Sequence, residues 1–198
     1  MSAPDTPAPG RSGSFGGITR GGSRSRARAE TFAAGAPADA ETMRAVRRRW
    51  ASGVAVVATR VPEGLRGATV SAFTVVSLAP PLVLACLDRS GRIATAVPEA
   101  GCFAVSLLDR AQEAIADRFA GLGPLPDARF TGIPHLFAGT GCPVIAGALA
   151  WFDCRVQATY DGGDHVIVVG AALTVGLGVD SDDPLISYEG RYRGIEPA

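Results

Sequence analysis

The chain has 198 residues, of which 47% are hydrophobic, and its 19 basic and 19 acidic residues give a formal net charge of zero. A chain of this length can bury one sizeable core, and the lack of a basic excess argues against general nucleic-acid binding. No apolar run approaches the ~20 residues that span a bilayer, and the N-terminus has no apolar stretch of the ~7–15 residues found in a signal peptide, so we expect a cytoplasmic protein without a membrane contact.

Residues 1–38 differ in composition from the rest of the chain. They are rich in Gly, Ser, Ala, Pro and Arg and contain few large apolar residues. Such a segment cannot bury enough apolar surface to fold. We therefore predict a disordered tail over residues 1–38 and one folded domain over residues 39–198. The arginines of the tail are expected either to be solvated or to make a weak electrostatic contact with a partner.

The folded part is expected to begin with a short helix. Asp39 is a suitable N-cap, and Gly53 is expected to end the helix. Met43, Val46 and Trp50 lie at i, i+3 and i+7 and form one apolar stripe. The arginines of the last turn interact favourably with the helix dipole, so they need no ligand to explain them.

Two further helices are expected between strands. Residues 92–97 predict a short helix that Pro98 stops, and Asp109 is a suitable N-cap for a helix over residues 110–120. The inner side of the second helix comprises Ala111, Ile115, Ala116 and Phe119.

The remainder reads mainly as strands. Apolar and β-branched runs are separated by turn signals such as Pro62-Glu63-Gly64 and Asp161-Gly162-Gly163-Asp164. Strands in hairpin order, with helices at two excursions, favour a mainly β fold with flanking helices, built as an antiparallel barrel. The expected strands are residues 54–59, 67–76, 82–87, 103–108, 148–160, 165–176 and 185–188, and residues 121–147 are expected to be rich in loops.

Residues 66–92 carry the clearest sign of a binding site. A hydroxyl-rich run over residues 69–77 is joined through Pro80-Pro81 to a core strand over residues 82–87, and this strand ends in Asp88-Arg89-Ser90-Gly91-Arg92. Hydroxyls and exposed N–H groups beside a Ser/Gly/Arg turn can hold an anion. The pattern therefore suits an anionic ligand with a flat polar ring.

Several other kinds of site are not expected. The pairs Gly121-Leu-Gly123 and Gly176-Leu-Gly178 lack the third glycine of a dinucleotide-binding loop, and no phosphate-binding P-loop or nucleophile elbow is present. A hydrolase built on a catalytic triad is thus not expected. The four cysteines form no C-x-x-C pair, which favours free thiols over a metal site.

Two features near the end of the chain leave alternatives open. His165 follows Asp164 at the mouth of a hairpin, where it either reaches a ligand beside the barrel or hydrogen-bonds locally. Arg191-Tyr192-Arg193 follow Gly190 and either close over a ligand or pack on the barrel or on a neighbouring subunit.

Seven stretches, taken in order, are similar to one known family. They are residues 49–57 (RWASGVAVV), 67–74 (GATVSAFT), 80–90 (PPLVLACLDRS), 117–121 (DRFAG), 147–155 (GALAWFDCR), 163–165 (GDH) and 190–193 (GRYR). The chain resembles, over about residues 43–193, the short flavin reductases, which are the reductase components of two-component flavin-dependent monooxygenases in the FMN-binding split-barrel superfamily.

The resemblance implies an antiparallel, Greek-key-like split β-barrel that works as a homodimer. It implies FMN or FAD in a groove near the dimer interface, NADH or NADPH as the reductant, and a flavin-dependent monooxygenase as the partner that receives reduced flavin. His165 would meet the nicotinamide nucleotide. The residues implied to bind flavin are Thr69, Val70, Ser71 and Ala72 along the ring, Cys86, Leu87 and Asp88 on the next strand, Ser90 and Arg92 at the phosphate, and Phe119 beside the ring.

The chain departs from the family pattern at two places near the phosphate. Gly91 stands where many relatives have a second Ser, and Ile93 stands where they have a Thr. The loss of these hydroxyls would shift the phosphate contacts toward Arg92 and backbone N–H groups.

Three functions fit this resemblance. The leading expectation is an NAD(P)H:flavin oxidoreductase that transfers hydride to flavin. A second is an FMN-dependent oxidase or reductase of a small organic substrate, and a third is a non-enzymatic flavin-binding or carrier protein. Gly163-Asp164-His165 favours the first, since a passive binder has no evident use for a histidine that faces nicotinamide.

Overall fold

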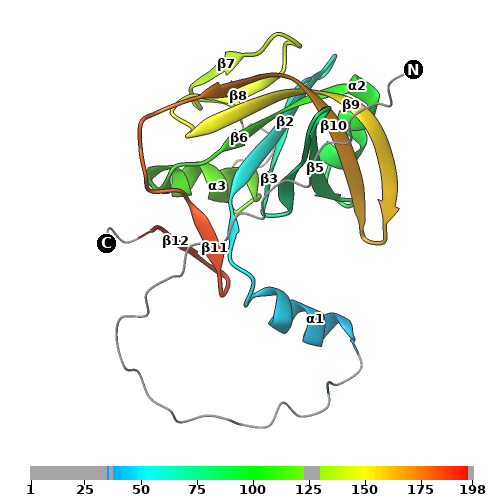
Figure 1. Cartoon of the computed structure of the whole chain (residues 1–198), viewed down its shortest axis with the longest axis vertical. Coiled ribbons are helices and arrows are strands. Elements are labelled where there is room, and N and C mark those ends of the chain that lie inside the picture. The colour runs from blue at the N-terminus through cyan, green and yellow to red at the C-terminus, as the bar shows by residue number, and fades with distance from the viewer. Residues whose placement is uncertain (1–34, 36–37, 123–129, 196–198) are drawn as a thin grey trace, which may run out of the picture. The chain divides into compact units, whose positions relative to one another are not determined.

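The computed structural model describes residue 35 and residues 38–122 and 130–195 (Figure 1). The chain divides into two compact units, Met1–Pro37 and Ala38–Ala198, and the fold below belongs to the second. The predicted disordered tail over residues 1–38 lies outside the described residues, apart from residues 35 and 38. No helix in the described ranges is long and apolar enough to cross a membrane.

One antiparallel sheet of seven strands dominates the fold, in the order β3-β2-β6-β9-β10-β5-β4. The prediction of a mainly β chain is thus confirmed, and the two longest strands form the expected hairpin, with His165 opposite Gly162. The strands are β2 (Ala55–Val61), β3 (Gly64–Val70), β4 (Phe73–Leu78), β5 (Pro81–Asp88), β6 (Cys102–Leu107), β9 (Ala150–Gly162) and β10 (His165–Leu177).

Strand β2 is buried on both faces, which explains its continuous apolar sequence. Ala55 and Val57 point into one apolar cluster, which the sheet shares with the helix α2. Val56 and Ala58 point to the other face and pack in a second cluster with Phe119. Residues 55–59 of the strand therefore have no solvated face, and only Arg60, near the end of the strand, is exposed.

The helix α2 (Ile93–Ala100) covers one side of the first cluster through Ile93, Ala94 and Val97. The prediction that Pro98 stops this helix is wrong, because Pro98 lies inside it. The ring removes one backbone N–H donor, but the helix continues until Gly101, whose φ of 68° places it in the left-handed region that ends helices.

The second predicted helix starts at its expected N-cap but is divided in two. A short 3₁₀ turn, η1 (Arg110–Gln112), precedes α3 (Glu113–Phe119), and Asp109 forms a capping box with Gln112. Ala116 and Phe119 are buried as expected, and Ile115 packs on the second cluster. Ala111 is exposed instead of inward, because the tighter 3₁₀ turn changes the phase of the side chains.

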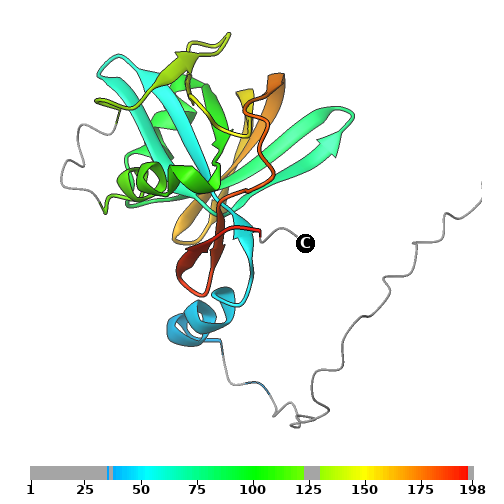
Figure 2. The ribbon, with the colours of Figure 1, turned by 90° about the vertical axis from the view of Figure 1, so that its left-hand side faces the viewer.

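The predicted single strand over residues 67–76 is in fact two strands. β3 pairs with β2, whereas β4 pairs with β5, and Ser71-Ala72 forms the link between them. Figure 2 shows the β2–β3 and β4–β5 hairpins diverging from this link. The link thus lies where the chain passes from one edge of the sheet to the other.

Two small sheets complete the described fold. β1 (Ser52–Gly53), β11 (Ile186–Tyr188) and β12 (Arg191–Arg193) form one, and β7 (His135–Phe137) and β8 (Pro143–Ile145) form the other. The sequence predicted neither β12 nor β7 and β8. Strands of two or three residues leave almost no periodic signal.

The first helix, α1 (Ala40–Arg47), has the predicted N-cap, since Asp39 accepts a hydrogen bond of 2.7 Å from the N–H of Thr42. It ends at Arg47, with Arg48 as its C-cap, so Trp50 of the predicted stripe lies beyond the helix. Gly53 belongs to β1 and does not stop the helix. No residue of α1 is buried, and Met43, Val46 and Trp50 are 57%, 64% and 77% exposed. The apolar stripe is therefore uncovered in the single chain.

Candidate functional site

The turn after β5 is organised around Asp88. Its carboxylate accepts hydrogen bonds from the N–H and the hydroxyl of Ser90, at 2.8 and 2.7 Å, and its carbonyl accepts one from the N–H of Gly91. The two hydrogen bonds from Ser90 lower the pKa of the Asp88 carboxyl, with a smaller contribution from His165. The hydroxyl of Ser90 is thus turned toward Asp88 and would have to rotate to donate to a phosphate.

Arg89 joins this turn to the β9–β10 hairpin. Its guanidinium donates to the carbonyl of Gly163 and to Asp161, each at 2.8 Å, and its backbone N–H donates to the carbonyl of Asp164. The hydrogen bonds of Gly163 and Arg89 lower the pKa of Asp161. Two segments far apart in the sequence, both singled out as candidate sites, are therefore held together.

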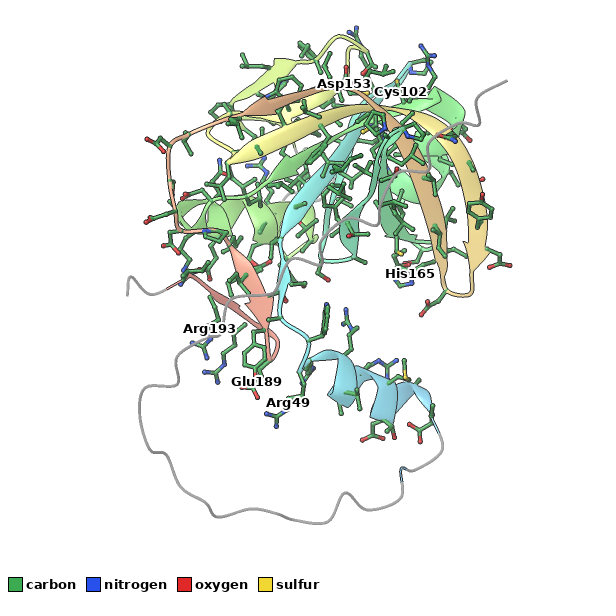
Figure 3. The ribbon with its side chains drawn as sticks, viewed as in Figure 1. Arg49, Cys102, Asp153, His165, Glu189 and Arg193 are labelled. Carbon is green, nitrogen blue, oxygen red and sulfur yellow. The ribbon has the colours of Figure 1, made fainter. Side chains whose placement is uncertain are left out.

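His165 lies at the first residue of β10, directly opposite Asp88 on β5. Its Nδ1 is 2.6 Å from a carboxylate oxygen of Asp164, and its side chain is 40% exposed. This contact between neighbouring residues orients the imidazole ring through Nδ1. His165 is thus partly exposed, at the end of the β9–β10 hairpin (Figure 3).

The link between β3 and β4 borders a hollow. The carbonyl of Ala72 accepts a hydrogen bond of 2.9 Å from the N–H of Cys86, so the predicted ring-binding residues of the two strands are neighbours. Ser71 and Ala72 line a pocket of about 320 Å³. Ligand pockets in proteins commonly measure ~300–1,000 Å³. The hollow can therefore accept part of a ligand of nucleotide size.

The predicted ring-binding residues differ in their solvent exposure. Ser71 and Cys86 are half-buried, and burial raises the pKa of the Cys86 thiol, so it is a neutral group. Val70 and Leu87 are buried in the first apolar cluster. The hydroxyl of Thr69 donates to the carbonyl of Ala116 at 2.7 Å. Val70, Leu87 and the Thr69 hydroxyl are thus occupied by the fold, and a ligand would meet these residues through backbone groups.

Phe119 is 1% exposed and packs against Phe130, with ring centroids 4.8 Å apart. Its Cε1 atom would lie 2.8 Å from a Cβ added to Gly67, so Gly67 leaves the space that the ring fills. In the single chain, the ring of Phe119 thus packs from α3 against Gly67 of β3. Arg92 precedes α2 and is exposed, at the turn that Asp88 organises.

The structure adds residues to the pocket that the sequence did not single out as binding residues. Arg47, Arg48 and Trp50 line it from the end of α1, and Ser52 lines it from β1. Ser187, Tyr188, Glu189 and Gly190 close the remaining side. The only sequence signals were the arginine-rich end of the helix and the GRYR motif, because contacts between distant segments leave no local pattern.

The four cysteines are free thiols, as predicted. No group of three or more potential metal ligands occurs among the residues that the structure describes. Sγ of Cys142 lies 3.5 Å from Sγ of Cys102, and burial raises the pKa of Cys102 to about 11 and that of Cys154 to about 12. These thiols are poor nucleophiles near neutral pH.

The described fold combines a seven-stranded antiparallel sheet, a turn ordered by Asp88 and a partly exposed histidine at the start of β10. Residues 47–196 match the flavin reductase like domain family. The chain belongs to this family, and the resemblance noted in the sequence is confirmed.

Relatives with names from the same family are similar to most of this chain. The chain is 39% identical over 155 residues to the reductase component of 4-hydroxyphenylacetate 3-monooxygenase from Thermus thermophilus, covering 78% of this chain and 96% of the relative. It is 35% identical over 160 residues to the reductase subunit HsaB of a flavin-dependent monooxygenase from Mycobacterium tuberculosis, covering 80% and 84%. The NADH:FAD oxidoreductase SgcE6 of Streptomyces globisporus, solved with NAD and FAD fragments, superposes with a TM-score of 0.74 at 32% identity, covering 80% of this chain and 94% of that one.

Proposed function

We propose that this protein is the reductase component of a two-component flavin-dependent monooxygenase, which reduces flavin with a nicotinamide nucleotide and supplies the reduced flavin to its partner. The observation that carries the proposal is the pairing of Asp88 with His165. It brings the turn expected to hold the flavin phosphate beside the motif expected to meet nicotinamide. Relatives named as monooxygenase reductase components support the same reading.

The residues present fit a flavin. Ser71 and Ala72 are small and border a hollow, which allows a flat ring to approach the backbone closely. Around them we assign Thr69, Val70, Cys86, Leu87 and Asp88 to the edge of the ring, largely through main-chain groups. We assign Ser90 and Arg92 to the phosphate and Phe119 to support of β3. The flavin would be FMN or FAD.

When bound, the flavin supplies the chemistry by accepting a hydride from NADH or NADPH at its N5 atom. The protein then needs no strong acid or base. Its residues hold two flat rings in contact and exclude water, and N–H donors near the ring stabilise negative charge as it develops. His165, oriented by Asp164, is assigned to position the nicotinamide.

We further infer a split β-barrel that is active as a homodimer. Apolar residues are exposed in groups, which is uncommon for a monomer. Met43 and Val46 of α1 are exposed, and so is Trp50, which follows the helix. Val75, Val76 and Leu78 of β4 and Leu173, Val175 and Leu177 of β10 are also exposed. A second copy of the chain would cover such surfaces.

A direct assay tests the reductase activity. Purified protein mixed with FMN or FAD should oxidise NADH or NADPH, and stopped-flow absorbance should show loss of the oxidised flavin band. No bleaching with any of the four nucleotide–flavin pairs would exclude the reductase. Reductase and a monooxygenase kept apart by a dialysis membrane should still give hydroxylated product if reduced flavin diffuses between them.

Light scattering after size exclusion tests the homodimer. The wild-type protein should have twice the mass of one chain. Val46→Ser should weaken the dimer, whereas Ala45→Ser, at the adjacent exposed helix position, should leave it unchanged. A monomeric wild-type protein at micromolar concentration would overturn this part of the proposal.

A further inference from the structure

The β11–β12 hairpin presents two arginines on its outer face. Tyr192 packs, half-buried, against the second apolar cluster. Successive side chains of a strand point to opposite faces. Arg191 and Arg193 therefore share the face that points away from the core, and both are exposed. The packed tyrosine thus sets the face of the hairpin from which both arginine side chains project.

The end of α1 is held against this hairpin. The backbone N–H of Glu189 donates to the carbonyl of Arg48 at 2.9 Å, and its carboxylate lies 2.7 Å from Nη1 of Arg49. Glu189 has a φ of 53° and Gly190 a φ of 73°. A left-handed conformation is unfavourable for a residue with a side chain, so it persists where the surroundings enforce it. The left-handed conformation of this turn accompanies the contact between Glu189 and Arg49.

Four arginines consequently surround one hollow of about 470 Å³. Arg48 and Arg49 come from the end of α1, and Arg191 and Arg193 come from β12. Glu189 is the only acidic residue that lines this hollow in the described part of the chain. The lining carries a net charge of about +3 in a protein whose formal net charge is zero. Figure 3 shows Arg49, Glu189 and Arg193 gathered at this place.

This arginine hollow adjoins the pocket at the strand link. Arg48 and Glu189 line both cavities, whereas Ser71 and Ala72 line only the pocket at the strand link. A ligand that lies beside Ser71 and passes over Arg48 would reach Arg191 and Arg193. A long anionic ligand could thus occupy both hollows.

We propose that the arginine hollow binds the phosphates on the adenylate half of the nicotinamide dinucleotide, an inference that rests on the proposed function. Flavin already has a phosphate site assigned at Ser90 and Arg92, at the other end of the ring-binding segment. The dinucleotide is the second long anion that the reaction requires, and it carries a pyrophosphate and, in NADPH, a 2′-phosphate. Guanidinium groups bind phosphate oxygens in bidentate geometry.

Equilibrium binding without turnover tests the proposal. Calorimetric titrations of the whole protein would use NAD⁺, NADP⁺ and nicotinamide mononucleotide, with the double variant Arg191→Gln/Arg193→Gln. We expect Kd for the dinucleotides to rise about tenfold or more and Kd for the mononucleotide to stay within twofold. A larger rise for NADP⁺ than for NAD⁺ assigns the hollow to the 2′-phosphate, and equal rises assign it to the 5′-phosphate of the adenylate, because nicotinamide mononucleotide carries the other phosphate of the pyrophosphate.

Arg155→Gln is the matched control, because it removes an exposed arginine of β9 that does not line the hollow. It should leave every Kd unchanged. The wild-type Kd for the dinucleotides should also rise between low and high salt, and less so in the double variant, since exposed charges are screened over ~10 Å at 0.1 M salt.

Three results would overturn the proposal: dinucleotide affinities within twofold of wild type, an equal loss of mononucleotide affinity, or conversion of the double variant to a monomer. The last would assign the arginines to a subunit contact. Failure of the proposed function itself would look different, because the wild-type protein would then oxidise neither NADH nor NADPH in the presence of flavin.

Discussion

Asp88 and His165 are direct cross-strand partners, at the last residue of β5 and the first residue of β10. The neighbouring carboxylate of Asp164 contacts Nδ1 of His165 at 2.6 Å. The arrangement holds the ring in place while its side chain remains 40% exposed. An oriented, accessible imidazole is well suited to positioning a nicotinamide ring against a second flat ring.

Replacement of His165 tests this role. His165→Ala should slow flavin reduction by roughly tenfold or more, because the nicotinamide loses its orientation. Flavin affinity should change less than twofold. Single-turnover stopped-flow absorbance and flavin titration measure the two effects. His135→Ala, the change at the chain's other histidine, should leave the rate near wild type. A loss of flavin affinity in His165→Ala would instead assign His165 to the flavin site.

The variant Thr69→Val tests whether the Thr69 hydroxyl stabilises the fold or binds flavin. The hydroxyl donates to the carbonyl of Ala116, so its loss should cost about 1 kcal/mol of unfolding free energy. Flavin affinity should be almost unchanged. Urea unfolding and flavin titration measure both, with Thr159→Val, at an exposed position of β9, as the control. Weaker flavin binding with unaltered stability would show that the hydroxyl faces the ligand.

Gly170→Ala tests the close packing of β10 on the core. A Cβ at this position would lie 2.5 Å from Cζ of Phe103 and 3.1 Å from Cβ of Cys154. Because Phe103 is fully buried, it has little room to move, and overpacking of this kind costs ~1–3 kcal/mol. Calorimetry should show a lower Tm. Gly53→Ala, where nothing lies within 4 Å, should be close to neutral. Equal Tm values for both variants would contradict this packing.

Asp109 links stability to pH. The hydroxyl of Ser181 and the N–H of Ala111 donate to its carboxylate and lower its pKa. The folded state therefore binds the proton less readily than the unfolded state, so this contribution is present above the ordinary aspartate pKa and is lost as pH falls through the folded value.

Asp109→Asn should thus be less stable than wild type at pH 7, and the difference should shrink below about pH 4. Urea unfolding across a pH series measures it. Asp182→Asn removes a carboxylate from the loop that carries Ser181 and corrects for the change in net charge. A stability difference that grows in acid would reverse the assigned sign.

Much of the fold was predictable because local signals agreed with the tertiary structure. Asp39 and Asp109 cap helices as expected, and the 161–164 turn joins the two longest strands. The errors fall where packing overrides local preference. Pro98 lies inside α2, and the strand expected over residues 67–76 divides at Ser71-Ala72.

The sequence by itself determined the family, the mainly β class and the segments around the site, since side-chain alternation, turn residues and ordered motifs are all local. Only the tertiary structure decided which of these segments meet. The pairing of β5 with β10 sets Asp88 opposite His165, and the β11–β12 turn brings Arg191 and Arg193 to the end of α1. Such contacts arise from strand register and core packing between residues far apart in the chain, and no short stretch of sequence encodes them.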